Sequence, residues 1–232
     1  VSTEGQVHCW GVGIDPTRFE RDGDFDQASP PPISEPVQMV SAGARHTCAL
    51  TMSGHVVCWG SNQYGQSTPP MLTWPAVQLT SGRSHSCARS ADGQVACWGD
   101  DRMNQLSIPD TETFIQIDAG GDGTCGQKSD YTLTCWGGSE LNPSTEAVHT
   151  FALGDQTLCL QRIQESDDTT QPETICDTPS ALNSTNTTTP WRFTLSDVAL
   201  NAIDAGMGYA CALRADERIT CVGNHAPLPR PK

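Results

Sequence analysis

Ten of the eleven cysteines fall into pairs at regular spacing, and this limits the folds open to the chain. Four pairs are ten residues apart and one is seventeen apart: Cys48 and Cys58, Cys87 and Cys97, Cys125 and Cys135, Cys211 and Cys221, and Cys159 and Cys176. A glycine stands five residues before each leading cysteine, at Gly43, Gly82, Gly120, Gly154 and Gly206. Trp-Gly follows a cysteine four times, at Trp10, Trp59, Trp98 and Trp136. A unit that recurs every 34 to 52 residues or so indicates a repeat protein.

The spacing of ten predicts a disulfide-bridged hairpin. Met52-Ser53-Gly54 lies midway between Cys48 and Cys58, and a three-residue hairpin loop favours a left-handed glycine at its last position. Residues equidistant from such a loop face each other with Cα atoms about 4.5 to 5.5 Å apart, which suits a disulfide. We therefore predict five bridges: Cys48–Cys58, Cys87–Cys97, Cys125–Cys135, Cys159–Cys176 and Cys211–Cys221.

One such unit is too small to bury its own faces, so neighbouring units must pack against one another. The sequence predicts an all-β fold, a β-propeller of five complete units and an N-terminal half unit, as a single domain over residues 1–232. The half unit carries Cys9 without the strand that should face it. Three interpretations remain open: upstream blades of a longer chain, strands supplied by another chain, or a free buried thiol.

The cysteine content and the net charge indicate the compartment of the protein and limit its classes of partner. Regularly spaced cysteines indicate an oxidising compartment, so we expect a secreted, extracellular or cell-surface protein. Zinc binding would favour C-x-x-C pairs, which the sequence lacks. The net charge of −14 argues against nucleic acid as a partner, and no apolar run is long enough for a transmembrane segment.

The repeat resembles that of the regulator of chromosome condensation (RCC1) family. Residues 41–50 (SAGARHTCAL), followed by SGHVVCWGSN at 53–62 and Gly65-Gln66, carry the resemblance. The unit from Ser81 to Leu106 matches nearly as well, and the stretch from about 147 to 177 is degenerate. The resemblance implies a β-propeller, commonly of about seven blades, and is greatest to secreted, cysteine-rich bacterial members. The family includes nucleotide-exchange factors and enzyme-inhibiting propellers, and an intracellular exchange role does not fit so many cysteines.

Two loops carry candidate sites. In the acidic, proline-rich loop at residues 14–36, Asp22, Asp24 and Asp26 alternate as in a calcium site, although Gln27 and Ile33 exclude an EF-hand. The alternative is a solvated acidic loop, and no other cofactor is expected. The Ser/Thr/Asn-rich insert at residues 177–194 contains candidate glycosylation sites at Asn183 and Asn186. Its alternative is an unmodified surface loop.

Two histidines recur at one repeat position, two residues before the leading cysteine. We interpret His46 and His85 as structural residues that bond a neighbouring blade's backbone, rather than as metal ligands. Asp122 stands close to the equivalent place in the third unit, and we interpret it as repeat variation.

The sequence contains none of the catalytic motifs that we sought, including G-x-S-x-G and H-E-x-x-H. We therefore expect no enzyme, with catalytic and cofactor-binding residues unassigned. The favoured function is an extracellular protein-binding or assembly module whose partner is a protein or a neighbouring subunit. The alternatives are a glycan-binding propeller, with Trp74 and Trp191 stacking on sugars, and a secreted enzyme inhibitor.

Overall fold

The computed structural model describes residues 1–10, 25–138, 147–155, 157–162, 174–177, 193–195, 200–206, 209–214 and 217–223. All regular structure in these residues is β-strand. The chain divides into two compact units, residues 1–129 with 134–139 and residues 130–133 with 140–232. The single-domain organisation stays a prediction.

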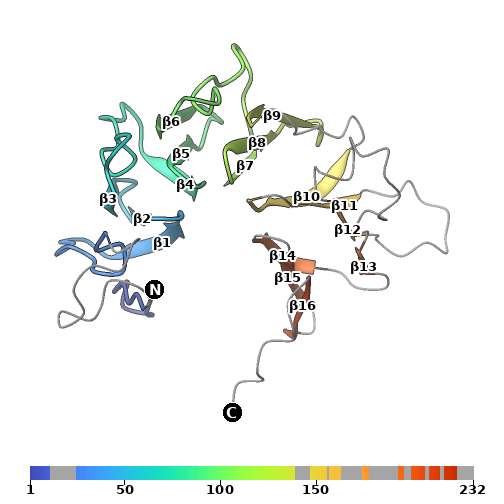
Figure 1. Ribbon diagram of the computed structural model, residues 1–232, viewed down its shortest axis with the longest axis horizontal. Helices are drawn as coiled ribbons and strands as arrows, with labels where there is room; N and C mark the ends of the chain where they lie inside the picture. Colours follow the sequence, from blue (N-terminus) through green and yellow to red (C-terminus); the bar gives the residue numbers. More distant parts are fainter. Residues whose placement is uncertain are drawn as a thin grey trace. The chain divides into compact units, whose positions relative to one another are not determined.

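The first unit contains three antiparallel sheets, each formed by three consecutive strands (Figure 1). The strands are β1 (Val37–Ala42), β2 (His46–Thr51), β3 (Val56–Gly60), β4 (Ala76–Ser81), β5 (His85–Ser90), β6 (Val95–Gly99), β7 (Gln116–Gly120), β8 (Gly123–Gln127) and β9 (Leu133–Gly137). The first strands β1, β4 and β7 lie side by side, and the third strands lie apart from one another. This is the arrangement of consecutive propeller blades.

The second unit contains two sheets. Its strands are β10 (Val148–Leu153), β11 (Leu158–Arg162), β12 (Thr174–Asp177), β13 (Phe193–Leu195), β14 (Leu200–Ala205), β15 (Tyr209–Arg214) and β16 (Ile219–Gly223). The first sheet has the order β10-β11-β12-β13, so this degenerate repeat has a fourth strand. The second sheet, β14-β15-β16, has the three-stranded order of the first unit.

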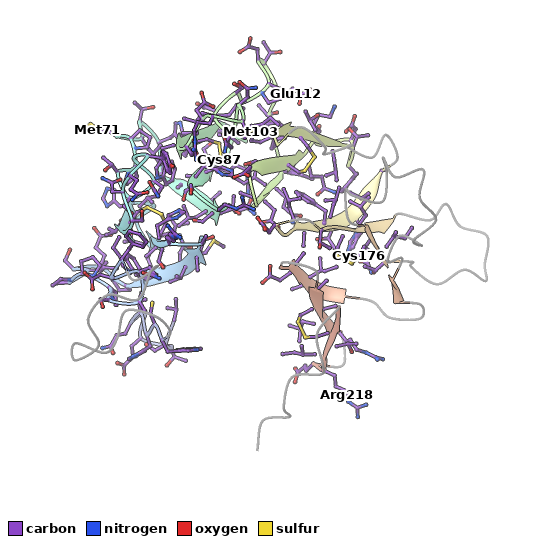
Figure 2. The ribbon with its side chains drawn as sticks, in the orientation of Figure 1. Met71, Cys87, Met103, Glu112, Cys176 and Arg218 are labelled. Atoms are coloured by element: carbon purple, nitrogen blue, oxygen red, sulfur yellow. A yellow bond between two sulfur atoms is a disulfide. The ribbon has the colours of Figure 1, made fainter. Side chains whose placement is uncertain are left out.

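The hairpin register explains the disulfides. Cys48 lies opposite Cys58, and the same pairing recurs at Cys87, Cys159 and Cys211 with their partners. The structure contains all five predicted bridges, with Cα–Cα distances of 4.0 to 4.1 Å. The bridge of Cys87 lies within the second sheet, where the residue is labelled in Figure 2. Because the other ten cysteines are paired, Cys9 has no disulfide partner in this chain.

The hydrophobic cores of the first unit lie between successive sheets. Trp98 from β6 packs in one cluster with Cys48 and Leu50 from β2. In the next cluster, Trp136 packs with Phe114, and their ring centroids are 5.4 Å apart. Trp98 and Trp136 therefore fill the space between their own sheet and the preceding one, which is how units too small to bury their own faces become stable.

The tip of each hairpin contacts the start of the next repeat. Gly54 has a φ of 87°, as predicted for the last loop position, and its carbonyl accepts a 3.0 Å hydrogen bond from the Ala76 amide. In the next repeat, the Gly93 carbonyl accepts the equivalent hydrogen bond from the Phe114 amide at 3.0 Å. A Cβ atom on Gly54 would lie 2.6 Å from the Cβ of Pro75, so this contact requires glycine.

We expect Gly54→Ala to lower the free energy of unfolding by about 2 kcal/mol or more, because it adds left-handed strain and a clash with Pro75. The matched control is Gly65→Ala. Gly65 also has a positive φ, 83°, but nothing lies within 4 Å of an added Cβ atom, so only the strain of about 1 to 2 kcal/mol applies. Urea denaturation measures the free energy of unfolding of both variants. An equal decrease in the two would contradict a destabilising clash between residue 54 and Pro75.

Candidate binding surface

The antiparallel order of the strands brings two loops of every repeat to the same end of its sheet. The turn between the first two strands lies at the end where the third strand finishes. The Ser61 amide donates to the Arg45 carbonyl at 2.7 Å, and in the next repeat the Asp100 amide donates to the Ser84 carbonyl at 2.9 Å. Turn and loop are therefore joined at this end of the first two sheets.

The turns of neighbouring sheets are also joined to each other. The Ala44 amide donates to the Arg83 carbonyl at 3.3 Å, and the Arg83 amide donates to the Gly121 carbonyl at 2.7 Å. The Arg83 side chain lies 3.3 Å from the carboxylate of Asp122. Asp122, interpreted from the sequence as repeat variation, thus forms an ion pair with Arg83 of the preceding repeat. The turns of the three sheets form one continuous surface.

Arginine and aromatic side chains gather on this surface. We call it the loop-end surface and define it by Phe25, Arg45, Tyr64, Arg83, Arg102, Met103 and Asp122, with the buried Asp100 beneath Arg102. The guanidinium carbon of Arg102 lies 4.3 Å from the centroid of the Tyr64 ring, and that of Arg45 lies 5.2 Å from the Phe25 ring. Tyr64 is 40% exposed and Met103, labelled in Figure 2, is 42% exposed. Stacking of this kind holds large amphipathic side chains in place at a surface.

Asp100 fixes the position of Arg102. The Arg102 side chain donates from Nε and Nη2 to both carboxylate oxygens of Asp100, at 2.6 to 3.1 Å. Hydrogen bonds from Arg102 lower the pKa of the Asp100 carboxyl against the opposing effect of burial, so the carboxylate is ionised at neutral pH. The arginine is thus oriented before any partner arrives, which reduces the entropy lost on binding.

A glutamine in the loops after β3 and β6 supports the surface from beneath. The side-chain oxygen of Gln66 accepts a hydrogen bond from the Tyr64 amide at 2.8 Å. The backbone carbonyl of Gln66 accepts one from the Trp98 indole of the next repeat at 3.0 Å. Gln105 makes the same two contacts with Met103 and Trp136. Sequence reasoning missed this role, although the recurrence of glutamine at one repeat position was a signal for it.

The two recurrent histidines connect neighbouring sheets. Nε2 of His46 lies 2.8 Å from the Ser86 hydroxyl, and Nε2 of His85 lies 2.8 Å from the Thr124 hydroxyl. Both histidines are fully buried, and this burial lowers the pKa of each from 6.5 to about 4. The histidines are structural, as the sequence indicated. Nε2 of each contacts a side-chain hydroxyl, and His85 also forms a hydrogen bond with the backbone of Gly123 in the next sheet, the kind of contact that was expected.

The candidate calcium loop is only partly described. Asp22 and Asp24 lie outside the described residues. Asp26 has a φ of 59°, and it occupies the left-handed turn position taken by Gly65 in the next repeat and by Asn104 in the one after. In the part of the chain that the structure describes, no three His, Cys, Asp or Glu residues are grouped so that they could hold a metal ion.

A serine, a histidine and a glutamate meet at the opposite end of the first sheet. Nδ1 of His55 lies 3.0 Å from the Ser53 hydroxyl and 3.2 Å from Glu35, and the Ser53 hydroxyl also donates to Glu35. These hydrogen bonds lower the pKa of Glu35. A catalytic triad needs the histidine to contact the serine and the acid through different ring nitrogens. Here one nitrogen faces both, so the cluster is not arranged as a triad.

The tryptophan proposed for sugar stacking lies in the proline-rich connection between the first two repeats. Trp74 is half-buried and packs against the core cluster of Leu50 and Trp98. It borders a groove of about 520 Å³ with Met71, which is 96% exposed and labelled in Figure 2. Trp191, Asn183 and Asn186 lie outside the described residues.

Comparison with protein families identifies the repeats. Residues 37–66 and 76–105 match the family model described as the regulator of chromosome condensation (RCC1) repeat. These two segments are similar to RCC1 repeats. The two matched segments correspond to the first two sheets and include the loops that carry Gln66 and Gln105.

Solved structures share the fold. The ectodomain of the receptor kinase CR4 from Physcomitrella patens is 25% identical, with a TM-score of 0.66 over 90% of this chain and 56% of its own. The CRINKLY WD40 ectodomain of the Arabidopsis thaliana receptor kinase ACR4 is 24% identical, with a TM-score of 0.63 over 84% and 66%. Prp20p from Saccharomyces cerevisiae, whose binding to Gsp1p and histones has been described, is 16% identical, with a TM-score of 0.58 over 81% and 58%.

This chain spans 56% to 66% of the length of these three solved chains. The similarity therefore applies to part of each of these chains. Within the described residues, the structure has no helix of the length and hydropathy needed to cross a membrane.

We expect acid to destabilise the protein through His46 and His85. Because burial holds each pKa near 4, below the 6.5 of the unfolded chain, the stabilisation is complete above about pH 6.5 and is lost as the pH falls toward 4. The shift corresponds to about 3 kcal/mol for each histidine. Denaturation at pH 7, 5.5 and 4 measures the slope. A variant with both His46→Gln and His85→Gln is expected to show a shallower slope, and an unchanged slope would refute the assignment.

Proposed function

We propose that the chain is an extracellular protein-binding module without catalytic activity of its own, and that it binds its partner through the loop-end surface. The observation that carries the proposal is the exposed Tyr64–Arg102 pair, held in position by Asp100 and Gln66. Tyrosine and arginine dominate the binding energy of many protein interfaces.

The composition of the surface supports a protein partner. Tyrosine, phenylalanine, methionine and arginine are enriched at protein interfaces, and all four occur here, contributed by consecutive repeats. Acidic side chains balance the arginines, at Asp100 and Asp122. A mixed surface of this kind favours a polar protein partner over a polyanion.

The extracellular setting is supported by the five disulfides, which persist in oxidising compartments. The similarity to two receptor-kinase ectodomains agrees with this setting. The structure of yeast Prp20p is described together with its binding to Gsp1p and histones, and a second structure has yeast RCC1 (Prp20) bound to Kap60. Protein binding is therefore a use to which this fold is suited.

The test is affinity capture from native surface and secreted fractions, with the captured protein then titrated against variants. Tyr64→Ala and Arg83→Ala are expected to weaken binding by tenfold or more each, since interface tyrosines and arginines commonly contribute about 1 to 3 kcal/mol. Met71→Ala, an exposed residue at the opposite end of the repeat, is the control and is expected to bind normally.

A partner that binds wild type and both variants equally would show that binding uses another surface. Saturable binding of a substrate with turnover would contradict the non-catalytic proposal. Absence of any protein partner in both native fractions would contradict protein binding itself.

A further inference from the structure

Residues 6–10 have the sequence and position of a third strand in a repeat. Their Val7-His8-Cys9-Trp10 corresponds to Val56-Val57-Cys58-Trp59 in β3. The preceding turn has the hydrogen bonds of the β2–β3 hairpin, from the Ser2 amide to the Gln6 carbonyl at 2.8 Å and from the Gly5 amide to the Ser2 carbonyl at 3.0 Å.

The turn before residues 6–10 contacts the start of the next repeat, as the hairpin turns at Gly54 and Gly93 do. Gly5 has a φ of 75°, and its carbonyl accepts from the Val37 amide at 2.9 Å, as Gly54 accepts from Ala76. Val7 and Cys9 pack against the cluster of Val37, Ala49 and Trp59. The segment is therefore already seated against the sheet that follows it.

The other side of residues 6–10 lacks the paired strand and the disulfide that β3, β6 and β9 have. Among the described residues, 6–10 take part in no sheet, and Cys9 is in no disulfide. Trp10 is 85% exposed, whereas Trp59, Trp98 and Trp136 at the same repeat position are 5 to 7% exposed. Two independent features therefore distinguish this segment from β3, β6 and β9: its cysteine is unpaired where theirs is bridged, and its tryptophan is exposed where theirs is buried.

The other repeats show what covers such a segment. The middle strand places a cysteine opposite the trailing cysteine, and a threonine or serine opposite the tryptophan, as in Thr47↔Trp59 and Ser86↔Trp98. The first strand then pairs with the middle strand. In the described part of the chain, each pair of first and middle strands already has its own third strand, so none is left for residues 6–10.

We propose that residues 6–10 form an acceptor edge for the first two strands of an RCC1-like repeat that lies outside residues 1–232. The incoming middle strand pairs with this edge and carries a cysteine opposite Cys9. Formation of the bridge removes two protons and two electrons from the two thiols and transfers them to a disulfide oxidant such as oxidised glutathione, which is reduced to two thiols.

Trp10 becomes buried in the same step, so binding has a second readout that is independent of sulfur chemistry. Burial raises the pKa of the Cys9 thiol, so the thiol is protonated at neutral pH and reacts slowly unless it is aligned with its partner. Correct strand register is therefore expected to control the reaction.

The first test uses a synthetic peptide of residues 37–51, which carries a first and a middle strand with Cys48 in register. The control peptide has Thr47→Cys and Cys48→Ser, which moves the thiol to the opposite face of the strand. In a glutathione buffer, we expect the matched peptide to form at least tenfold more mixed disulfide with Cys9, measured by non-reducing mass spectrometry. It should also protect Trp10 from a fluorescence quencher, with Trp10→Phe identifying that signal. Equal yields from both peptides, or no protection, would count against the acceptor edge.

The second test uses the protein from its native source, alkylated before reduction and then digested. We expect Cys9 to be bridged to a peptide that has a glycine five residues before its cysteine, as in the other repeats. Sequencing that peptide shows whether one gene or two encode the repeat. Complete alkylation of Cys9, or a bridge to a peptide without the repeat pattern, would overturn the proposal.

Discussion

The fold of the first unit depends on hydrogen bonds that a buried polar side chain can form only with a neighbouring repeat. The Trp98 indole finds its acceptor at Gln66, and the His46 imidazole finds a hydroxyl at Ser86. A buried polar group without a partner costs about 1 to 3 kcal/mol, so a repeat with no neighbour is penalised at each of these positions. Buried polar side chains therefore help to specify the stacking of the sheets, together with the apolar clusters.

The disulfides have a different and more local role. Each bridge closes a hairpin within one repeat, and four of them span only ten residues. Chain entropy gives about 3 kcal/mol for a loop of this length. None of the five bridges joins one sheet to another. The cross-links therefore stabilise individual hairpins, and the contacts between repeats must hold the hairpins together.

The same contacts account for the proposed binding surface. Turns that are tied to each other by Ala44, Arg83 and Gly121 leave their side chains on one side, where a partner can reach several repeats at once. The glutamines that accept from the buried tryptophans also shape the loops that carry Tyr64 and Met103. The positions of the exposed Tyr64 and Met103 thus depend on the same glutamines that accept hydrogen bonds from the buried tryptophans.

The sequence by itself determined everything that depends on short-range geometry. A spacing of ten fixed the hairpin register, the disulfide pairs and the left-handed glycine at Gly54, because these follow from one turn and two strands. It could not identify the partners of His46, Trp98 or Arg83, since each partner lies about one repeat away and its position depends on how the sheets pack. Asp122 appeared to be variation until the adjacent turn placed Arg83 beside it. Only the tertiary structure decided these contacts, because they join residues that no local rule of spacing relates.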